Sequence, residues 1–484
     1  MKDTTSRQKH KKNIQLRLPK LQVHLDKPQD EFAYGGLTLV HQLARKVRFN
    51  MHIREHVNVL KIHQGYGESE HLYHLLSALF AGAGCVEDVG QLQNNEAYKK
   101  MVGVDQVTDP TTMGDFLRRF ERKDLNGLKA AMWGMRREAW KKLSRRKRRR
   151  ASLDLDSKIC PIYGNKKEGA DFSYQGSYGY HPEMLSLAET GEWLDAVNRS
   201  GNEVSGDKAA YLLRRNLPRV KGHFSSVCVR GDTKFGRGDV LKECARQGAY
   251  VCLGWPATAP LVGKVENLSE KVWSLFERKD LQRTAKIKPR KKKRNLRRLK
   301  ARKRGYKDKK LLKEWVTEFR YHPIYKKKPL AKAYRMIVIR KQIEVAGKTG
   351  LFDMYKYRFI LADLPGRNLK ELVRYAYGRS HQENLIEQGK NGVSAFRMPT
   401  GQLLANEVWM TVAMLAQNFK SYLCLLALGE DKLGWEWKRF RFSFVYFVAR
   451  VTRAGRRIHL WLDPGHLYVN KIRTGLLLLG ADYT

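Results

Sequence analysis

The sequence predicts a mixed α/β fold, in which a helical region precedes a domain of alternating strands and helices. Three observations support this. Apolar residues recur at helical spacing from Gly35 to about Leu143, strand-like and helical segments then alternate from Ala151 to Leu253, and both types return after residue 330. With 484 residues, of which 42% are hydrophobic, the chain is long enough for about three packed domains and is not a disordered polymer.

The charge of the chain predicts a polyanionic partner. Lys and Arg number 94 against 48 Asp and Glu, which gives a formal net charge of +46. Such a chain repels itself unless a polyanion neutralises it, and nucleic acid is the usual polyanion. A ribosome-associated or membrane-surface protein is the alternative, although the chain is too long and too well patterned to be a simple basic tail.

The first 150 residues divide into an arm and a helical domain. Residues 1–34 are polar and basic and lack the apolar segment of a signal peptide. In residues 35–150, helical runs begin at Gly36 and Leu72, and Asp109-Pro110 is typical of a capped helix start. Several short helices in a basic region favour a DNA-binding domain, and a structural bundle is the equally weighted alternative.

Residues 151–255 predict the first part of an α/β core. Ala151–Asp156 alternates apolar and acidic residues as a strand does, and Thr190-Gly191 separates two strand-like runs as a hairpin turn does. The remaining segments are a helix at 208–216, a strand at 226–230, a helix at 240–246 and a strand at 249–253. This order is typical of a three-layer α/β domain.

Residues 256–365 are predicted to be an insertion subdomain with a basic arm and strands. Arg278–Lys310 contains 19 Lys or Arg against two acids, and strand patterning returns at 334–345 and 355–363. We expect the basic arm to lie along a phosphate backbone. The DNA-binding residues predicted in it are Arg290, Lys291, Lys292, Lys293, Arg294, Arg297 and Arg298.

The remaining chain is predicted to complete the core. Residues 366–430 contain two helices, at about 368–388 and 402–428, and residues 431–484 are a candidate dimerisation region. The second helix is apolar but is interrupted by polar residues, which favours a buried helix over a membrane span. The six cysteines show no C-x-x-C spacing and are expected to be free thiols in a reducing compartment.

Three acidic residues are candidate ligands for divalent cations. Asp156 and Asp232 lie at the ends of predicted strands, and Glu383 lies on the long helix that follows the last strands. Hard cations prefer carboxylate oxygens, and a two-ion site needs about three carboxylates. Each acid taken alone is more often a turn residue or a helix cap.

The long helix is predicted to present one functional face. Tyr375, Glu383 and Lys390 each fall within about 40° of Arg379 on a continuous helix. A carboxylate flanked by a phenol, a guanidinium and an ammonium suits a site that binds both metal and DNA phosphate. The alternative is a solvated face on which an Arg–Glu pair contributes a few tenths of a kcal/mol.

Three motifs together resemble a known family. They are Asp156-Ser157, the run Arg230–Phe235 (R-G-D-T-K-F), and Arg379, Glu383 and Lys390 spaced as R-x3-E-x6-K. This combination resembles the DDE transposases of bacterial insertion sequences, in the branch with a Y-R-E-K signature on its catalytic helix. Supporting matches at 163–170, 179–182 and 449–451 extend the resemblance over roughly residues 35–465.

The resemblance implies an RNase H-like catalytic core with an inserted subdomain, for which the 151 positions between Asp232 and Glu383 leave room. It implies that Asp156, Asp232 and Glu383 hold two Mg²⁺ ions, with Mn²⁺ able to substitute, for DNA cleavage and strand transfer in cut-and-paste transposition. The implied partners are double-stranded DNA at terminal inverted repeats, target DNA and a second copy of the chain. The implied location is the bacterial cytoplasm at the nucleoid, without a membrane.

Several alternatives stay open at this point. The signature places Tyr three residues before Arg379, where Ala376 stands, so either Tyr375 or Tyr377 fills that role; helical geometry favours Tyr375. Asp154 and Asp156 point to the same side of a strand, and the D-S motif favours Asp156. The functional alternatives are an RNase H-like nuclease without strand transfer and a catalytically silent or domesticated DNA-binding protein.

Overall fold

The computed structural model describes residues 31–61, 65–277, 309–325, 327–345, 354–454 and 457–482. Its centre is a nine-stranded sheet with the strand order β10-β11-β14-β15-β9-β8-β2-β6-β7. β2 is parallel to β8, β8 is parallel to β9, and the other neighbours are antiparallel. The strands are β2 (Arg150–Ser157), β6 (Glu183–Leu187), β7 (Glu192–Val197), β8 (Ser226–Gly231), β9 (Tyr250–Trp255), β10 (Ser274–Leu275), β11 (Lys309–Tyr321), β14 (Tyr334–Val345) and β15 (Met354–Ala362).

Helices cover both faces of this sheet because alternate residues of each strand point to opposite sides. In β8, Val227 and Val229 face a core shared with α7 and α8, whereas Cys228 faces a core shared with α12. The helices that flank the sheet are α7 (Ala209–Lys221), α8 (Gly238–Arg246), α9 (Ala259–Glu266) and α12 (Leu369–Tyr377). The predicted mixed α/β fold is confirmed, as is the hairpin that β6 and β7 form around Thr190-Gly191.

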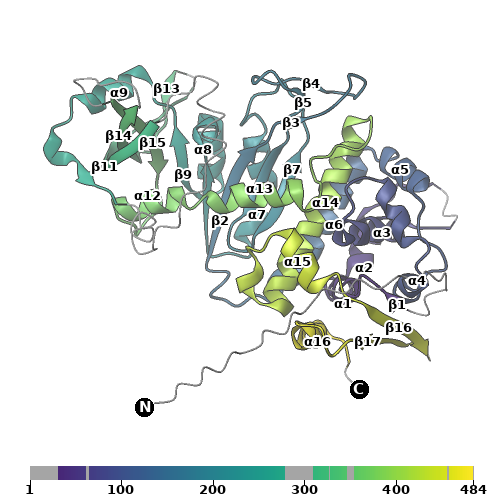
Figure 1. Cartoon of the computed structure of the whole chain (residues 1–484). Coiled ribbons are helices and arrows are strands. Elements are labelled where there is room, and N and C mark those ends of the chain that lie inside the picture. Colours follow the sequence, from purple (N-terminus) through teal and green to yellow (C-terminus); the bar gives the residue numbers. More distant parts are fainter. Residues whose placement is uncertain are drawn as a thin grey trace, which may run out of the picture.

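A helical body packs against the β6–β7 end of the sheet (Figure 1). The N-terminal helices are α1 (Leu37–Lys46), α2 (Phe49–His56), α3 (Glu68–Ala81), α4 (Glu96–Val102), α5 (Pro110–Arg118) and α6 (Arg122–Lys141). The C-terminal helices are α13 (Ser380–Asn391), α14 (Leu403–Leu423), α15 (Trp437–Phe444) and α16 (Val469–Leu478). As predicted, Asp109 caps α5: its side chain accepts a hydrogen bond from the Thr112 amide, and Pro110 occupies the first helical position.

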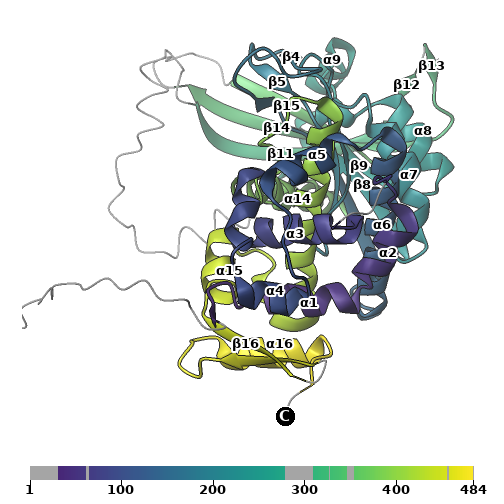
Figure 2. The same cartoon turned by 90° about the vertical axis from the view of Figure 1, so that its right-hand side faces the viewer.

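Short elements complete the fold. β1 (Glu31–Phe32) pairs with β16 (Ala449–Ala454), which also pairs with β17 (Arg457–Leu462), and Figure 2 shows this small sheet beside α16, away from the main sheet. The other short strands are β3 (Cys160–Pro161), β4 (Asp171–Phe172), β5 (Tyr178–Tyr180), β12 (Ile324–Tyr325) and β13 (Lys328–Pro329). The short 3₁₀ helices are Glu87–Leu92, Thr233–Phe235, Glu270–Val272 and Glu430–Lys432.

The predicted domain limits do not coincide with breaks in the hydrophobic core. The N-terminal helices share one apolar cluster with α14 and α15, so α3 packs against α14 from the other end of the chain (Figure 2). Likewise, β15 pairs with β9, so the strands of the predicted insertion extend the central sheet. The limits at residues 34, 150, 255, 365 and 430 therefore stay predictions.

One helix is long and apolar enough to cross a membrane by length and composition. It comprises α14 and the π-helical turn that follows, Leu403–Leu428, and 89% of its most apolar window is buried inside the protein. This burial fits the predicted core helix. All six cysteines are free, and five of them are buried.

Candidate active site

Two of the candidate carboxylates meet at one edge of the sheet. In the parallel pairing of β2 with β8, Asp154 is the register partner of Arg230. Asp156 and Asp232 each follow two residues later, so both lie where these neighbouring strands end. Asp232 caps the short helix Thr233–Phe235, and its Oδ1 accepts a hydrogen bond from the Lys234 amide at 2.9 Å.

Asp156 is partly buried and has one nearby cation. Its side chain is 22% exposed, and its Oδ2 lies 3.5 Å from Nη2 of Arg379, while the Ser157 amide donates to Oδ1 at 2.8 Å. Burial raises the pKa of Asp156 above its ordinary value. The Arg379 guanidinium opposes this rise, and the charge of Asp232 adds to it, so the two aspartates interact electrostatically.

Asp154 has a different environment from Asp156. Its two carboxylate oxygens accept hydrogen bonds from Nε and Nη2 of Arg230, both at 2.7 Å, and both side chains are almost fully buried. Such a bidentate pair occupies both oxygens of the carboxylate. Of the two acids that the sequence left open, Asp156 is therefore the one with oxygens available at the sheet edge.

The predicted continuous helix over 368–388 is wrong, because the chain breaks it at Gly378. α12 ends at Tyr377, and α13 begins at Ser380 after the capping residue Arg379. The Tyr375 carbonyl accepts hydrogen bonds from Nη1 of Arg230 at 3.1 Å and from the Gly378 amide at 3.2 Å. These contacts end α12, so Tyr375 does not share a helix with Glu383.

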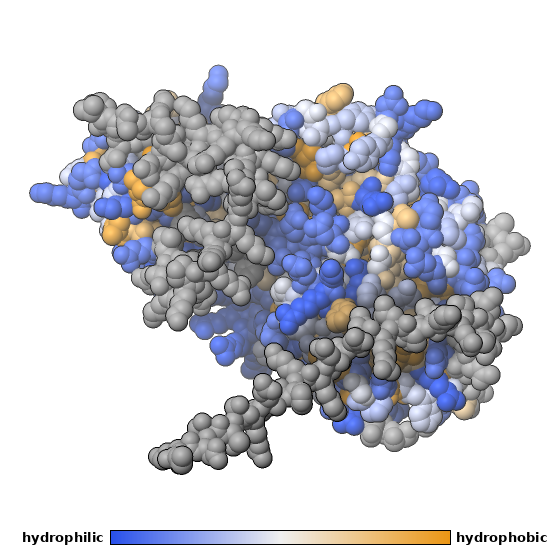
Figure 3. Space-filling view, viewed as in Figure 1, coloured by the Kyte–Doolittle hydropathy of each residue, from blue (hydrophilic) through white to orange (hydrophobic). Residues whose placement is uncertain are grey.

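Glu383 lies in the first turn of α13, and its side chain is exposed. Lys390 is seven residues further along the same helix and is also exposed, so both side chains fall on about one face. In the part of the chain that the structure describes, the oxygens of Asp156, Asp232 and Glu383 do not all lie within 4.8 Å of one another. Figure 3 shows that hydrophilic residues dominate the middle of the face on which Figure 1 displays α13 and β2.

Residues 32–479 match the family described as Transposase DDE domain group 1. The chain belongs to the DDE transposases. A piggyBac transposase, solved by cryo-EM in a synaptic complex with hairpin DNA, is 9% identical with a TM-score of 0.34, and the match covers 94% of this chain and 86% of that one. No curated protein matches the sequence.

In this transposase, the two candidate signature tyrosines contact other parts of the protein. The Tyr375 hydroxyl lies 2.8 Å from Oγ of Ser152, and the guanidinium groups of Arg230 and Arg367 lie over its ring, 4.8 and 4.4 Å from the ring centroid. Tyr377 instead donates to Oε1 of Glu314 on β11 at 3.1 Å. The predicted face shared by Tyr375, Arg379, Glu383 and Lys390 is therefore not formed. The basic-arm residues predicted to bind DNA, 290–298, lie outside the described residues.

The structure adds a positioning residue that the sequence did not single out. The Gln382 side chain is 3% exposed, and its amide nitrogen donates to the Asp154 carbonyl at 2.9 Å. Nη2 of Arg379 donates to the Leu155 carbonyl and to Oε1 of Gln382, both at 3.1 Å. Together the two side chains fasten the first turn of α13, which includes Glu383, to the end of β2. The sequence offered one indication of this contact, because Gln382 directly precedes Glu383 and lies three residues after Arg379.

A polar network connects the two strand ends. Oγ of Ser157 donates to Oγ of Ser205 at 2.9 Å and lies 3.0 Å from Nε2 of His181. Lys234, which follows Asp232, contacts Ser205 at 3.4 Å and the Tyr174 hydroxyl at 2.7 Å. Nδ1 of His181 lies 2.8 Å from the carbonyl oxygen of Glu203 and therefore carries the ring proton. Burial lowers the pKa of His181, which agrees with a neutral ring. Ser157 and His181 occur in the motifs noted above, but the sequence assigned them no role.

Proposed function

We propose that this transposase cuts and joins the ends of a mobile DNA element, with Asp156, Asp232 and Glu383 as its catalytic and metal-binding carboxylates. One observation carries the proposal: Asp156 and Asp232 end adjacent parallel strands, and burial, with a smaller contribution from the charge of Asp232, raises the pKa of Asp156. A partly buried carboxylate whose pKa is perturbed by burial and a neighbouring charge is typical of a catalytic site. An RNase H-like core is part of this proposal and is supported by the order β7-β6-β2-β8-β9.

The donor set fits divalent cations. Asp156 and Asp232 present hard oxygen ligands, and neither is held in a bidentate ion pair as Asp154 is. Mg²⁺, for which Mn²⁺ can substitute, would supply Lewis-acid activation of the attacking oxygen and charge stabilisation at the leaving oxygen. Arg379 orients Asp156, Gln382 holds the turn that carries Glu383, and the exposed ammonium of Lys390 is available to a DNA phosphate.

The proposed partners follow from this chemistry and from the charge of the chain. They are double-stranded DNA at terminal inverted repeats, target DNA and a second copy of the transposase in the synaptic complex. We assign the element to the bacterial insertion sequences of the Y-R-E-K branch and the protein to the nucleoid. The spacing of Arg379, Glu383 and Lys390 supports this assignment.

Alanine substitution of the carboxylates tests the proposal. Asp156→Ala, Asp232→Ala and Glu383→Ala should each abolish Mg²⁺-dependent cleavage of an end-containing duplex while preserving its binding, because each removes a metal ligand and no phosphate contact. Glu387→Ala is the matched control, since Glu387 is an exposed acid one turn further along α13. Normal cleavage by any of the three variants refutes the role of that residue.

An assay with pre-cut DNA ends distinguishes a transposase from a nuclease and from a DNA-binding protein. Joining of a pre-cut 3′ end to target DNA by the wild-type protein supports a transposase with strand transfer. Cleavage without joining would identify a nuclease, and binding without either reaction would identify a catalytically silent DNA-binding protein.

A further inference from the structure

A second group of metal-ligating side chains lies far from the sheet edge, on α2. Glu55 and His56 follow His52 by three and four residues, so each lies next to His52 on the surface of the helix. Oε2 of Glu55 lies 3.8 Å from Nδ1 of His52 and 3.8 Å from Nε2 of His56. Within the described ranges, no other set of three His, Cys, Asp or Glu residues has ligand atoms within 4.8 Å of one another.

His52 is buried without hydrogen bonds. Its side chain is 2% exposed, and neither Nδ1 nor Nε2 has a hydrogen-bond partner. The ring packs on Gly134 of α6 so closely that a Cβ at this glycine would lie 2.4 Å from Nδ1. A buried imidazole with both nitrogens unpaired is unfavourable, because its N–H and its lone pair have lost their contacts with water. A metal ion bound at Nδ1 would satisfy the lone pair of that nitrogen.

We propose that His52, Glu55 and His56 form a binding site for a transition-metal dication of the Zn²⁺ class. Two imidazole nitrogens and one carboxylate oxygen are a common three-residue set for Zn²⁺, with the fourth position open. Tetrahedral ligands about 2.1 Å from the metal are about 3.4 Å apart. The Glu55 oxygen lies 3.8 Å from a nitrogen of each histidine, and all three ligand atoms lie within 4.8 Å of one another. The site therefore has to close by about 1.4 Å or less, which the exposed side chains of Glu55 and His56 can do.

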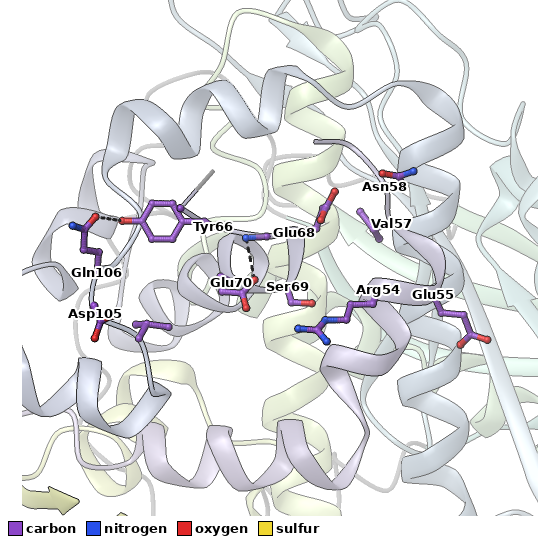
Figure 4. A pocket seen from close by; sticks show the side chains of 13 residues that line it. Arg54, Glu55, Val57, Asn58, Tyr66, Glu68, Ser69, Glu70, Asp105 and Gln106 are labelled. Carbon is purple, nitrogen blue, oxygen red and sulfur yellow. Dashed lines mark hydrogen bonds between the residues drawn. The ribbon is translucent and has the colours of Figure 1, made fainter. Parts of the chain in front are cut away.

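The neighbouring charges limit which ion the site accepts. A cavity of about 830 Å³ next to the site is lined by Arg48, Arg54, Arg137 and Lys141 as well as by Glu55 and Glu138. Lys141 is paired with Glu138 at 3.0 Å. Figure 4 shows Arg54 and Glu55 leaving α2 in different directions, and both residues also line a second cavity of about 1000 Å³.

The positive charge of these arginines disfavours weakly bound cations and favours an anion or hydroxide at the open position of a bound metal. Imidazole ligands bind Zn²⁺, Co²⁺ and Ni²⁺ much better than Mg²⁺. The site on α2 is thus chemically distinct from the all-carboxylate set at the sheet edge.

Titration with Co²⁺ tests the site, because its visible spectrum reports coordination number and nitrogen ligands. The protein is the untagged full chain carrying Asp156→Ala and Asp232→Ala, which removes the carboxylates that could also bind Co²⁺. We expect one equivalent to bind with the spectrum of a four- or five-coordinate ion, Zn²⁺ to displace it, and a 100-fold excess of Mg²⁺ to leave it bound.

Substitution of the exposed residues Glu55 and His56 tests whether they bind the metal and leaves the buried His52 in place. His56→Ala and Glu55→Ala should each weaken Co²⁺ binding at least tenfold while the circular dichroism spectrum stays unchanged. Arg54→Ala, on the same helix, is the control and should bind Co²⁺ at least as tightly as the parent. Equal affinity in His56→Ala, no binding in the parent, or displacement by Mg²⁺ would overturn the proposal.

Discussion

Two aspartates on one strand show how the environment decides the role of a residue. Asp154 and Asp156 are equivalent in the alternating pattern of β2, yet Arg230 binds both oxygens of Asp154, and Asp156 keeps its oxygens at the sheet edge. The D-S motif favoured Asp156 in the sequence. The physical reason why Asp156 rather than Asp154 has free oxygens is the register between β2 and β8, which pairs Asp154 with Arg230. A parallel pairing between residues 76 positions apart is not visible in one sequence.

We predict that Gln382 acts on catalysis through Glu383. Gln382→Met keeps the side-chain volume but removes the bonds to the Asp154 carbonyl and to Arg379. The loss of such outer contacts around metal ligands lowers activity or metal affinity by about 10–100-fold. We expect a higher Mg²⁺ concentration for half-maximal cleavage, with unchanged binding of end DNA.

The neighbouring exposed residue provides the control for this experiment. Asn384→Ala removes a side chain on the same turn of α13 without touching β2, and its Mg²⁺ dependence should match that of the wild type. A Gln382→Met protein with normal Mg²⁺ dependence but reduced thermal stability would show that Gln382 only supports folding.

The raised pKa of Asp156 predicts an acid limit to cleavage. Protons compete with metal for this carboxylate at a higher pH than for an ordinary aspartate, so the rate should fall as the pH decreases from neutrality. The effect of pH on folding stability has the opposite sign. Burial favours the protonated form of Asp156 in the folded state, so this carboxyl group stabilises the fold most at low pH. That contribution is lost as the pH rises through its folded-state pKa. Acidification through this group alone should therefore slow cleavage without unfolding the protein.

A pH–rate profile of single-turnover cleavage measures this limit. Arg379→Gln removes the cation that lowers the Asp156 pKa, so its acid limb should move to higher pH. An acid limb that stays in place would mean that another group controls it.

At the scale of elements, local patterns predicted most of the core strands and helices. The alternation in β2, the turn between β6 and β7, and the apolar run of α14 each depend on short-range spacing, and each appears where it was expected. The break between α12 and α13 was missed because its causes lie elsewhere in the chain. Arg230 on β8 binds the carbonyl of Tyr375, and Arg379 reaches back to the end of β2.

The basic arm between β10 and β11 is predicted to contact DNA without regard to sequence. In sequence it connects these two strands, which pair at the outer edge of the sheet. Replacing Arg290, Lys291, Lys292 and Lys293 with Gln should weaken binding to all duplexes. The slope of log K against log salt should become shallower by about 0.9 for each lost phosphate contact.

A variant that keeps the positive charge shows whether a change in DNA binding comes from the lost charge or from another effect of the substitutions. Changing Lys291, Lys292 and Lys293 to Arg should leave the salt slope unchanged. An unchanged slope in the neutralised variant would show that the arm is a solvated surface.

At the scale of the whole molecule, buried ionic groups join the helical body to the sheet. Arg136 of α6 belongs to a sequence segment dominated by Lys and Arg, yet its side chain is fully buried and its Nε donates to Glu192 on β7 at 2.8 Å. Lys129 of the same helix contacts Asp195 on β7 and Glu407 on α14, each at 3.0 Å. The sequence predicted a separate N-terminal domain because nothing in its local pattern distinguishes these buried cations from exposed ones.

Glu192 is predicted to be the most sensitive member of this connection. Its carboxylate also accepts hydrogen bonds from Trp140 at 2.7 Å and from the Tyr422 hydroxyl on α14 at 2.6 Å, so it holds three elements together. Glu192→Ala leaves Arg136 buried without its counter-ion, and breaking a buried pair in this way costs about 3–5 kcal/mol. We expect the free energy of unfolding in urea to fall by this amount.

Two further substitutions show whether the charge or the packing is responsible. Glu192→Gln keeps the side-chain shape but removes the charge and replaces one acceptor oxygen with an NH2 donor, so it should be destabilising because Arg136 loses its counter-ion. Glu203→Ala removes a partly exposed acid that is paired with Arg199 at 3.6 Å, and it should change stability by less than about 1 kcal/mol. If Glu192→Ala proved as mild as Glu203→Ala, the charge of Glu192 would not be what holds the helical body to the sheet.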